Sequence, residues 1–362
     1  MLKKVVSRGL LLILGVLAIA VVVALVWRAS RQHDVSEAMA IRDPNGIDER
    51  RHVRIGGVQQ WITIRGRNRD NPAVLVLHGG PGAPVSALPA HFIPWERDFT
   101  VIQWDQRGAG KSYYPSNTSP SIDLMIRDAL EVSEYVRQRL HKNKIILLGH
   151  SWGSVLGVHL VKARPDIFAA WVGTGQIVNA QQNEITAYVQ VLAKARARAD
   201  QQGVDALTKS GAPPYHQLQQ MGVERRWAMQ YEPGLRFSPR TGPKGLFAEL
   251  LSAPDYSLKD TVNYFKGVIG GDDFWGQSLE GPMMREDLRT LGTNFSVPVF
   301  IVEGADDDIT PGSLARSYFD QITAPHKAFL LMPDAGHMAL LTRSDAFLQF
   351  LVVNVRPLAL TQ

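Results

Sequence analysis

Residues 145–162 read IILLGHSWGSVLGVHLVK. The first four form an uninterrupted apolar run, which is typical of a parallel strand buried on both faces. Residues 154–162 are helix-like, and Gly149-His150-Ser151-Trp152-Gly153 lies between the two. A G-x-S-x-G turn between a strand and a helix holds its serine hydroxyl at the carboxyl edge of a sheet. The stretch therefore predicts an α/β fold in which Ser151 is a nucleophile.

Outward from this stretch, short apolar runs alternate with helix-like segments. Residues 122–136 place apolar side chains at helical spacing, with charged residues on the other faces. Strands alternating with helices predict a doubly wound, mostly parallel sheet. The further strand-like runs are 53–65, which reads as a hairpin turning at Gly56-Gly57, then 73–77, 101–104, 170–172, 297–302 and 327–332.

The alternation stops at about residue 176. Residues 176–290 contain Ala-rich helical sequence, Gly/Pro breaks and many aromatics, but no comparable apolar strand run. We interpret this as a helical lid inserted into one α/β domain. The predicted organisation is a membrane segment at 1–30, a polar tether at 31–52, the two parts of the core at 53–175 and 291–362, and the lid at 176–290.

Composition and charge exclude several classes of protein. The chain has 362 residues, 45% of them hydrophobic and 20% charged, which is typical of a globular protein. It has no cysteine, which excludes disulfides, thiolate metal sites and a cysteine nucleophile. Residues 1–54 hold nine Lys/Arg against five Asp/Glu, so +4 of the net +5 lies there and the body is at +1. Nucleic acid is therefore not an expected partner.

The basic excess surrounds an apolar leader. Residues 10–27 carry no charge, and as a helix they would span roughly 27 Å, which just reaches across a hydrocarbon core. Trp27 ends the run, and residues 26–30 (VWRAS) make a poor cleavage site, so we predict an uncleaved anchor with a cleaved signal peptide as the alternative. A short basic N-terminus usually stays in the cytoplasm, so the body is expected outside the cytoplasmic membrane, in a periplasm or its equivalent.

A serine nucleophile needs a base and a carboxylate that orients the base. In this type of fold they follow the serine in the order acid, then histidine. The acid is expected in the run of aspartates that follows the strand at 297–302. We choose Asp307, and Asp306 and Asp308 remain alternatives.

The base is expected after the strand at 327–332. His337 follows that strand among small residues. The other candidates are His326 at the start of a strand, and His159 and His141 within or at the end of helices. His337 is therefore the predicted base.

Acyl transfer also needs backbone N–H donors for the oxyanion. Trp152, directly after the serine, supplies one. The loop His78-Gly79-Gly80-Pro81-Gly82 follows the strand at 73–77 and supplies the other, since glycines let the backbone approach a substrate. Gly80 is our first choice and Gly79 the second.

Three motifs carry a family resemblance: HGGPG at 78–82, WDQRGAGKS at 104–112 and GHSWGS at 149–154. Together they resemble the proline iminopeptidase family of α/β hydrolases, and the similarity extends over about residues 55–355. The resemblance implies an α/β-hydrolase fold and a serine peptidase that releases an N-terminal residue from small peptides. It implies Ser151 as nucleophile, His337 as base and Asp307 as acid. This chemistry requires no metal or organic cofactor, and the sequence shows no ligand-spaced cluster of histidines and carboxylates that suggests one.

The WDQRGAGKS motif is not a phosphate loop. A Walker A loop needs a glycine where this chain has Asp105. The resemblance implies instead that Asp105 and Arg107 are structural.

The lid complies only in part with the family pattern. Members of the family hold the free α-amino group of the substrate with lid glutamates, and residues 227–232 (WAMQYE) resemble one such motif with altered spacing. Glu232 is thus the expected amine anchor, and Trp227 and Tyr231 are expected to bind substrate, with packing in the lid as the alternative. At the second motif Thr261 stands where the family has a glutamate. The alternative functions are a carboxylesterase or amidase on small neutral substrates and, more remotely, a non-catalytic ligand-binding homologue.

Overall fold

An eight-stranded sheet forms the centre of the body, in the order β1-β2-β4-β3-β5-β6-β7-β8. The computed structural model describes residues 2–114, 121–232, 243–271 and 279–360. β1 and β2 are antiparallel to each other, β2 is antiparallel to β4, and the remaining neighbours are parallel. The strands are β1 (Ile47–Ile55), β2 (Val58–Gly66), β3 (Ala73–Leu77), β4 (Thr100–Trp104), β5 (Ile145–His150), β6 (Phe168–Thr174), β7 (Val299–Gly304) and β8 (Lys327–Met332).

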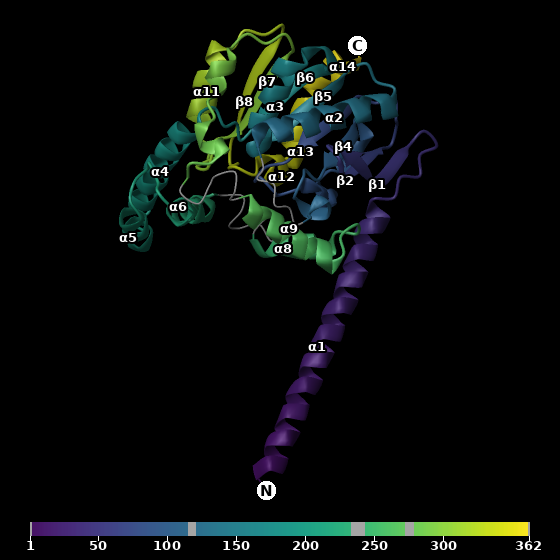
Figure 1. Cartoon of the computed structure of the whole chain (residues 1–362), viewed down its shortest axis with the longest axis vertical. Helices are drawn as coiled ribbons and strands as arrows, with labels where there is room; N and C mark the ends of the chain where they lie inside the picture. The colour runs from purple at the N-terminus through teal and green to yellow at the C-terminus, as the bar shows by residue number, and fades with distance from the viewer. Residues whose placement is uncertain (1, 115–120, 233–242, 272–278, 361–362) are drawn as a thin grey trace.

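Helices cover both faces of this sheet (Figure 1). The apolar runs are continuous because alternate residues of one strand enter opposite cores: Leu75 and Leu147 lie in one cluster, Val74 and Ile146 in the other. The helices of the body are α2 (Ile122–Leu140), α3 (Trp152–Ala163), α11 (Gly312–Gln321), α12 (Ala339–Thr342), α13 (Ser344–Phe350) and α14 (Arg356–Leu360). The predicted α/β fold is confirmed.

Strand positions agree with the sequence prediction to within about two residues, except that β1 begins at Ile47, six residues before the predicted hairpin. The hairpin turns at Gly56 and Gly57, which have φ of +53° and +80°, values that glycine adopts without strain. β7 begins at Val299, two residues later than the apolar run, because Pro298 has no N–H for the ladder. After β8 the chain forms α12, α13 and a π-helical turn at residues 351–355.

Between β6 and β7 the described residues form helices and turns, with isolated bridges from Asn179 to Asp287 and from Asn294 to Thr323. These helices are α4 (Ala180–Ala197), α5 (Gln201–Ser210), α6 (Leu218–Tyr231), α8 (Pro243–Ser252) and α9 (Leu258–Gly270). α4, α5 and α6 share a small apolar core of their own. In Figure 1 this group lies apart from α8 and α9, which are on the side of the body where α1 departs.

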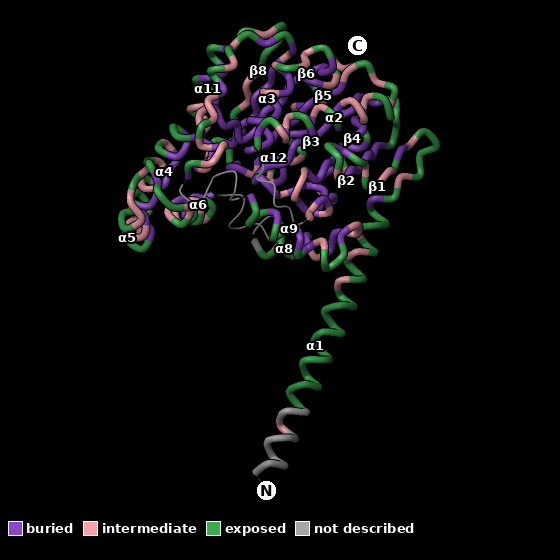
Figure 2. Tube along the Cα trace, viewed as in Figure 1, coloured by how far each residue is buried: buried purple, intermediate pink, exposed green. Residues whose placement is uncertain are grey.

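Helix α1 (Leu2–Ala38) projects out of the body (Figure 1). It is long and apolar enough to cross a membrane, and none of its most apolar window is buried in the body. Its apolar residues from Leu12 to Trp27 are exposed (Figure 2), as expected of an anchor or a signal sequence and not of a core helix. The helix continues through the first part of the predicted tether, since residues 28–38 contain no Gly or Pro, and β1 takes up the last part.

Candidate active site

Ser151 lies in the sharp turn between β5 and α3. Its φ of 56° and ψ of −120° are a strained conformation for a residue with a side chain. A Cβ at Gly149 would collide with the backbone of Gly153, and a Cβ at Gly153 with that of Leu77. Both glycines of the G-x-S-x-G pattern are therefore required by close packing of the turn against its neighbouring strand.

His337 and Asp307 are in direct contact. His337 Nδ1 lies 3.0 Å from Asp307 Oδ2, and both side chains are buried. Asp307 Oδ1 accepts hydrogen bonds from the backbone N–H of Ile309 at 2.9 Å and of Thr310 at 2.7 Å. Burial alone would raise the pKa of Asp307, but the nearby His337 and these hydrogen bonds outweigh it and hold the pKa below its usual value. The carboxylate is thus kept ionised beside the imidazole.

Thr310 is a further member of this contact that sequence reasoning missed. Its hydroxyl donates to Asp307 Oδ2 at 2.6 Å and lies 3.0 Å from His337 Nδ1. No motif singles out this threonine. It was detectable only as a hydroxyl three residues after an aspartate, a spacing that is common in turns.

The two neighbouring aspartates face the lid. Lys194 Nζ on α4 lies 2.7 Å from Asp308 Oδ2 and 3.7 Å from Asp306 Oδ1. Of the three candidate acids, the structure brings Asp307 to His337 and places the other two against a lysine.

The His337 ring lies beside the serine turn. The ring of His150, the residue before Ser151, is 4.7 Å from it between centroids, and His150 Nε2 is 2.9 Å from the His337 carbonyl oxygen. Burial, with His337 nearby, lowers the pKa of His150 to about 3, so it is a neutral donor. On the other side, a Cβ at Gly175 would come within 3.1 Å of His337 Nδ1. The loops after β5, β6, β7 and β8 therefore meet at one edge of the sheet.

The glycine loop after β3 lies against the same turn. A Cβ at Gly79 would be 3.0 Å from Ser151 Cβ, whereas one at Gly80, which has a φ of +114°, would meet its own loop. Of the two candidate oxyanion donors, Gly79 has the closer contact with the serine. Only glycine fits at this position.

The loop is braced by two residues that sequence reasoning did not assign. Burial lowers the pKa of His78 to about 4, and its Nδ1 is 2.8 Å from the Gly79 carbonyl oxygen. Its Nε2 accepts from the backbone N–H of Gln106 at 3.1 Å, and Trp152 Nε1 donates to Gln106 Oε1 at 2.9 Å. The motif at 104–112 thus connects the glycine loop to the serine turn.

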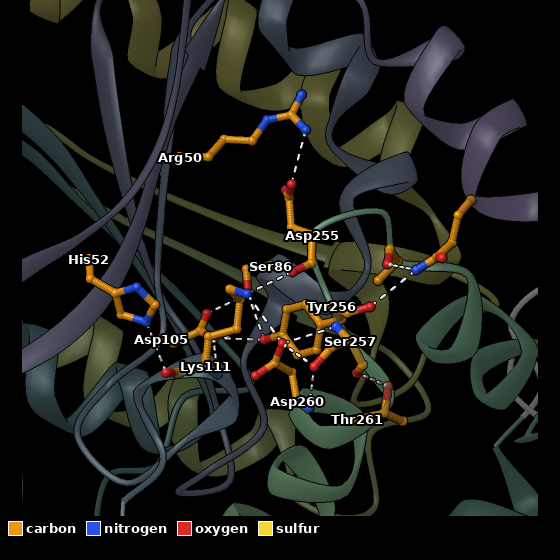
Figure 3. Close-up of polar contacts among 12 residues, drawn as sticks. Arg50, His52, Ser86, Asp105, Lys111, Asp255, Tyr256, Ser257, Asp260 and Thr261 are labelled. Carbon is orange, nitrogen blue, oxygen red and sulfur yellow. Dashed lines mark hydrogen bonds and ion pairs between the residues drawn. The ribbon is translucent and has the colours of Figure 1, made fainter. Parts of the chain in front are cut away.

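Asp105 and Arg107 make structural contacts. Arg107 forms a bidentate pair with Asp128, with Nε–Oδ2 at 2.7 Å and Nη2–Oδ1 at 2.8 Å. Asp105 accepts from Ser86, from the hydroxyl of Tyr256 at 2.7 Å and from the Lys111 N–H at 2.8 Å (Figure 3). Burial raises the pKa of Asp105 to about 6 in spite of these hydrogen bonds.

Glu232 is a buried carboxyl next to residues 336–338, which we call the histidine loop. It follows the end of α6, and its Oε1 accepts from the Met338 N–H at 3.2 Å. A Cβ at Gly336 would collide with its carboxyl group. Burial raises the pKa of Glu232 to about 7, partly opposed by His337. The lid thereby places one titratable carboxyl within contact of the residues on both sides of His337.

The other lid residues singled out from the sequence have packing roles. Trp227 and Tyr231 are buried in the core of the lid, 5.8 Å apart between ring centroids, and the Tyr231 hydroxyl donates to Asp200. Thr261 is buried on α9 and its hydroxyl donates to the Ser257 carbonyl at 3.2 Å. The structure thus places Glu232 alone of these four beside the histidine.

A cavity of about 730 Å³ lies between α4, α11 and β8. Its lining includes Lys194, Asp307 and Arg316, but neither Ser151 nor His337. The cavity therefore lies against residues 305–308, which include Asp307, and not against the nucleophile.

Known proteins share this architecture. The family described as alpha/beta hydrolase fold matches residues 72–344. A probable aminopeptidase of Bacillus subtilis, YbaC, is 30% identical over 301 residues, covering 82% of this chain and 93% of its own. A proline iminopeptidase of Lactobacillus delbrueckii subsp. bulgaricus is 23% identical over 312 residues, covering 83% and 95%. The crystal structure of a proline iminopeptidase from Mycobacterium smegmatis superposes with a TM-score of 0.65 at 18% identity, over 86% of this chain and 99% of its own. The chain belongs to the α/β hydrolase fold family.

Proposed function

We propose that this protein is a serine hydrolase that acts through an acyl-enzyme on Ser151 and releases the N-terminal residue from small peptides. The contact between His337 and Asp307, beside the strained turn that holds Ser151, is the observation that carries the proposal. A histidine held by an ionised carboxylate is the base that a serine hydroxyl needs.

In this mechanism the Ser151 hydroxyl attacks the scissile carbonyl and His337 takes its proton. Asp307 accepts a hydrogen bond from the Nδ1–H of the ring and stabilises the imidazolium. The N–H of Trp152 and an N–H of the glycine loop, at Gly80 or Gly79, donate to the oxyanion. His337 then protonates the leaving amine, and a water molecule activated in the same way hydrolyses the acyl-enzyme.

Glu232 supports action on a free N-terminus. An α-ammonium group in a partly dry site needs an anionic partner, and Glu232 is a carboxyl beside the histidine loop. The relatives named as aminopeptidase and proline iminopeptidase support the same substrate class. Thr261, which is hydrogen-bonded within its own helix, leaves the site without the second glutamate of the family pattern. This observation favours a second candidate, an esterase or amidase on small neutral substrates.

The test compares substrates and variants of the full chain. The wild type and a control, Ser317→Ala at an exposed position of α11, should react with a fluorophosphonate probe, and Ser151→Ala should not. Faster turnover of a proline arylamide than of a short-chain p-nitrophenyl ester supports the peptidase. Turnover of the ester alone would establish the second candidate, and a wild type that fails to react with the probe would overturn both.

We also propose that α1 anchors the protein in a membrane, with the body outside the cytoplasm. Its exposed apolar surface and the basic residues before it support this arrangement. Protease added to intact spheroplasts should then digest the body. Full protection of the body would reverse the orientation, and recovery of a chain that lacks residues 1–30 would show cleavage instead of anchoring.

A further inference from the structure

Helix α9 carries an apolar stripe that faces outward. Leu258, Val262, Phe265 and Ile269 follow one another at intervals of four, three and four residues, which places them on one face of the helix. A stripe at this spacing usually packs against a core. Here the four side chains are between 38% and 68% exposed.

The opposite face of α9 is the one that packs on the body. Asn263 and Gly267 are buried there, and Thr261 is buried at the flank of the helix. A Cβ at Gly267 would come within 2.8 Å of the Gly108 carbonyl oxygen and within 3.3 Å of that of Gly82, in the glycine loop. This close backbone contact fixes the rotation of α9, so the apolar stripe has no inward-facing alternative.

Helix α8 extends the apolar stripe. Phe247 is 50% exposed, and its ring lies 6.2 Å from that of Phe265 between centroids. We name Phe247, Leu258, Val262, Phe265 and Ile269 together the lid apolar surface. Three exposed lysines, at positions 244, 259 and 266, lie on the same two helices.

The connection between the two helices of the lid apolar surface is hydrogen-bonded to α1 just after its apolar run. Arg28, the first residue after that run, donates from Nη2 to the Tyr256 carbonyl at 2.5 Å. One turn further, Gln32 Nε2 donates to the carbonyls of Ala253 at 2.8 Å and Tyr256 at 3.1 Å. Residues 253–256 join α8 to α9, so this connection is attached to α1 within about one helical turn of the end of the apolar run.

The same connection is attached to the body on its other side (Figure 3). Lys111 Nζ donates to the Asp255 carbonyl at 2.7 Å, and Arg50 Nη1 lies 3.1 Å from Asp255 Oδ1. The Tyr256 hydroxyl donates to the buried Asp105. These contacts fix the position of the connection between α8 and α9 relative to both the body and α1.

We infer that the lid apolar surface is a second membrane contact, which rests in the interface of the bilayer that α1 crosses. The inference rests on the anchoring of α1 proposed above. Apolar side chains on one helix face, with exposed lysines on the same helices, are the composition that binds an interface rich in anionic lipid. The face of α9 that touches the glycine loop is then about one helix diameter, roughly 10 Å, from the lipid.

The experiment uses the absence of cysteine from the chain. Single variants Val262→Cys and Ile269→Cys carry an environment-sensitive fluorophore in the full chain, in vesicles of phosphatidylcholine and phosphatidylglycerol containing spin-labelled lipid. The matched control is Val353→Cys, an apolar position that is 58% exposed and lies just before α14, at the opposite end of the body from α1 in Figure 1. Leu17→Cys reports on α1 itself. Retained reaction with the fluorophosphonate probe shows that each variant is folded.

We expect the spin-labelled lipid to quench the fluorophores at positions 262 and 269 several-fold more than the one at position 353. The fluorophore at position 17 should also be quenched. Quenching at 17 but no more at 262 and 269 than at 353 would overturn the lid contact and leave the anchor intact. Absence of quenching at 17 would overturn the anchor. The labels at 262 and 269 could instead be shielded both from a water-soluble quencher in detergent and from the lipid quencher in vesicles. That result would assign the surface to a protein partner and overturn the inference.

Discussion

Replacing Glu232 with glutamine tests the proposed amine recognition most directly. Glutamine has the same size and keeps the carbonyl oxygen that accepts from the Met338 N–H, so the histidine loop retains its contact. The change removes only the charge. A charged hydrogen bond contributes about 1.5–3 kcal/mol, so kcat/KM for a proline arylamide should fall roughly 10- to 100-fold at pH 8. The ester should change only a few-fold, since it offers no ammonium group.

The pH dependence of this effect follows from burial. Because burial raises the pKa of Glu232 from 4.5 to about 7, the carboxyl is mostly neutral below that pH and ionised above it. In the wild type, the ratio of arylamide to ester kcat/KM should therefore rise with pH through about 7. The ratio cancels any titration of His337 that affects both substrates. In Glu232→Gln the ratio should be flat over the same range.

The free energy of unfolding of the wild type should fall as pH rises, whereas the substrate ratio rises. A carboxyl whose folded-state pKa is raised favours folding below its unfolded pKa, near 4.5, and this contribution is lost as pH rises through about 7. A pKa of about 7 in place of 4.5 corresponds to about 3 kcal/mol, so the free energy of unfolding of Glu232→Gln should gain up to that amount relative to wild type between pH 4.5 and 8. Urea unfolding of the full chain in detergent measures the difference.

The matched control is Glu224→Gln. Glu224 is a buried carboxyl on the same helix, and burial raises its pKa to about 7 as well, but its partners are Arg225 and Tyr215. Its substitution should leave the substrate ratio unchanged at every pH. Equal losses on arylamide and ester in Glu232→Gln, or a ratio that does not vary with pH in the wild type, would refute the assignment of Glu232 to the amine.

Three further predictions concern the base and the lid. Asp307→Asn should lower kcat for both substrates by about 10³- to 10⁴-fold, whereas Asp306→Asn should change kcat only a few-fold, because Asp306 faces a lysine. Steady-state rates measure both effects, and similar losses in the two variants would refute the assignment of Asp307 as the acid. Gly267→Ala places a Cβ 2.8 Å from the Gly108 carbonyl and should lower stability by about 1–3 kcal/mol, seen as a lower Tm; an unchanged Tm would contradict the close packing. Tyr256→Phe removes the hydroxyl that donates to Asp105 and should lower the free energy of unfolding by about 1–3 kcal/mol in the same thermal assay, and no loss would show that this hydrogen bond contributes little.

The sequence was sufficient for the parts of the site that follow strands. Parallel strands end at one edge of a sheet, so the loop that carries Asp307 and the loop that carries His337 had to approach each other once their strands were recognised. The strand run at 73–77 was recognisable because a continuous apolar run is a local property of a strand buried on both faces, as β3 is. The run at 327–332 was recognisable from the same local pattern, although β8 is an edge strand and is only partly buried.

Contacts between distant segments were not predictable in the same way. Tyr256 and Asp105 are 151 positions apart, and neither residue has a pattern that points to the other. Helical spacing identifies the apolar face of α9 but does not say whether that face is covered, because the periodicity of a buried face and of a lipid-facing one is the same. Similarly, nothing in residues 28–38 distinguishes a tether from a continuation of α1 except the absence of helix breakers.

The unbroken course of α1 as far as Ala38 has a consequence for how the proposed enzyme meets its substrates. A continuous helix without a proline or an interior break is stiff, and the body is hydrogen-bonded to it through Arg28 and Gln32. In the anchored arrangement the body can rotate about the membrane normal and diffuse laterally, but it cannot tumble freely. Dissolved peptides would still be turned over according to their bulk concentration. A peptide that partitions onto the bilayer would reach the enzyme according to its number per unit of membrane area, and would be consumed ahead of an equally reactive one that remains dissolved.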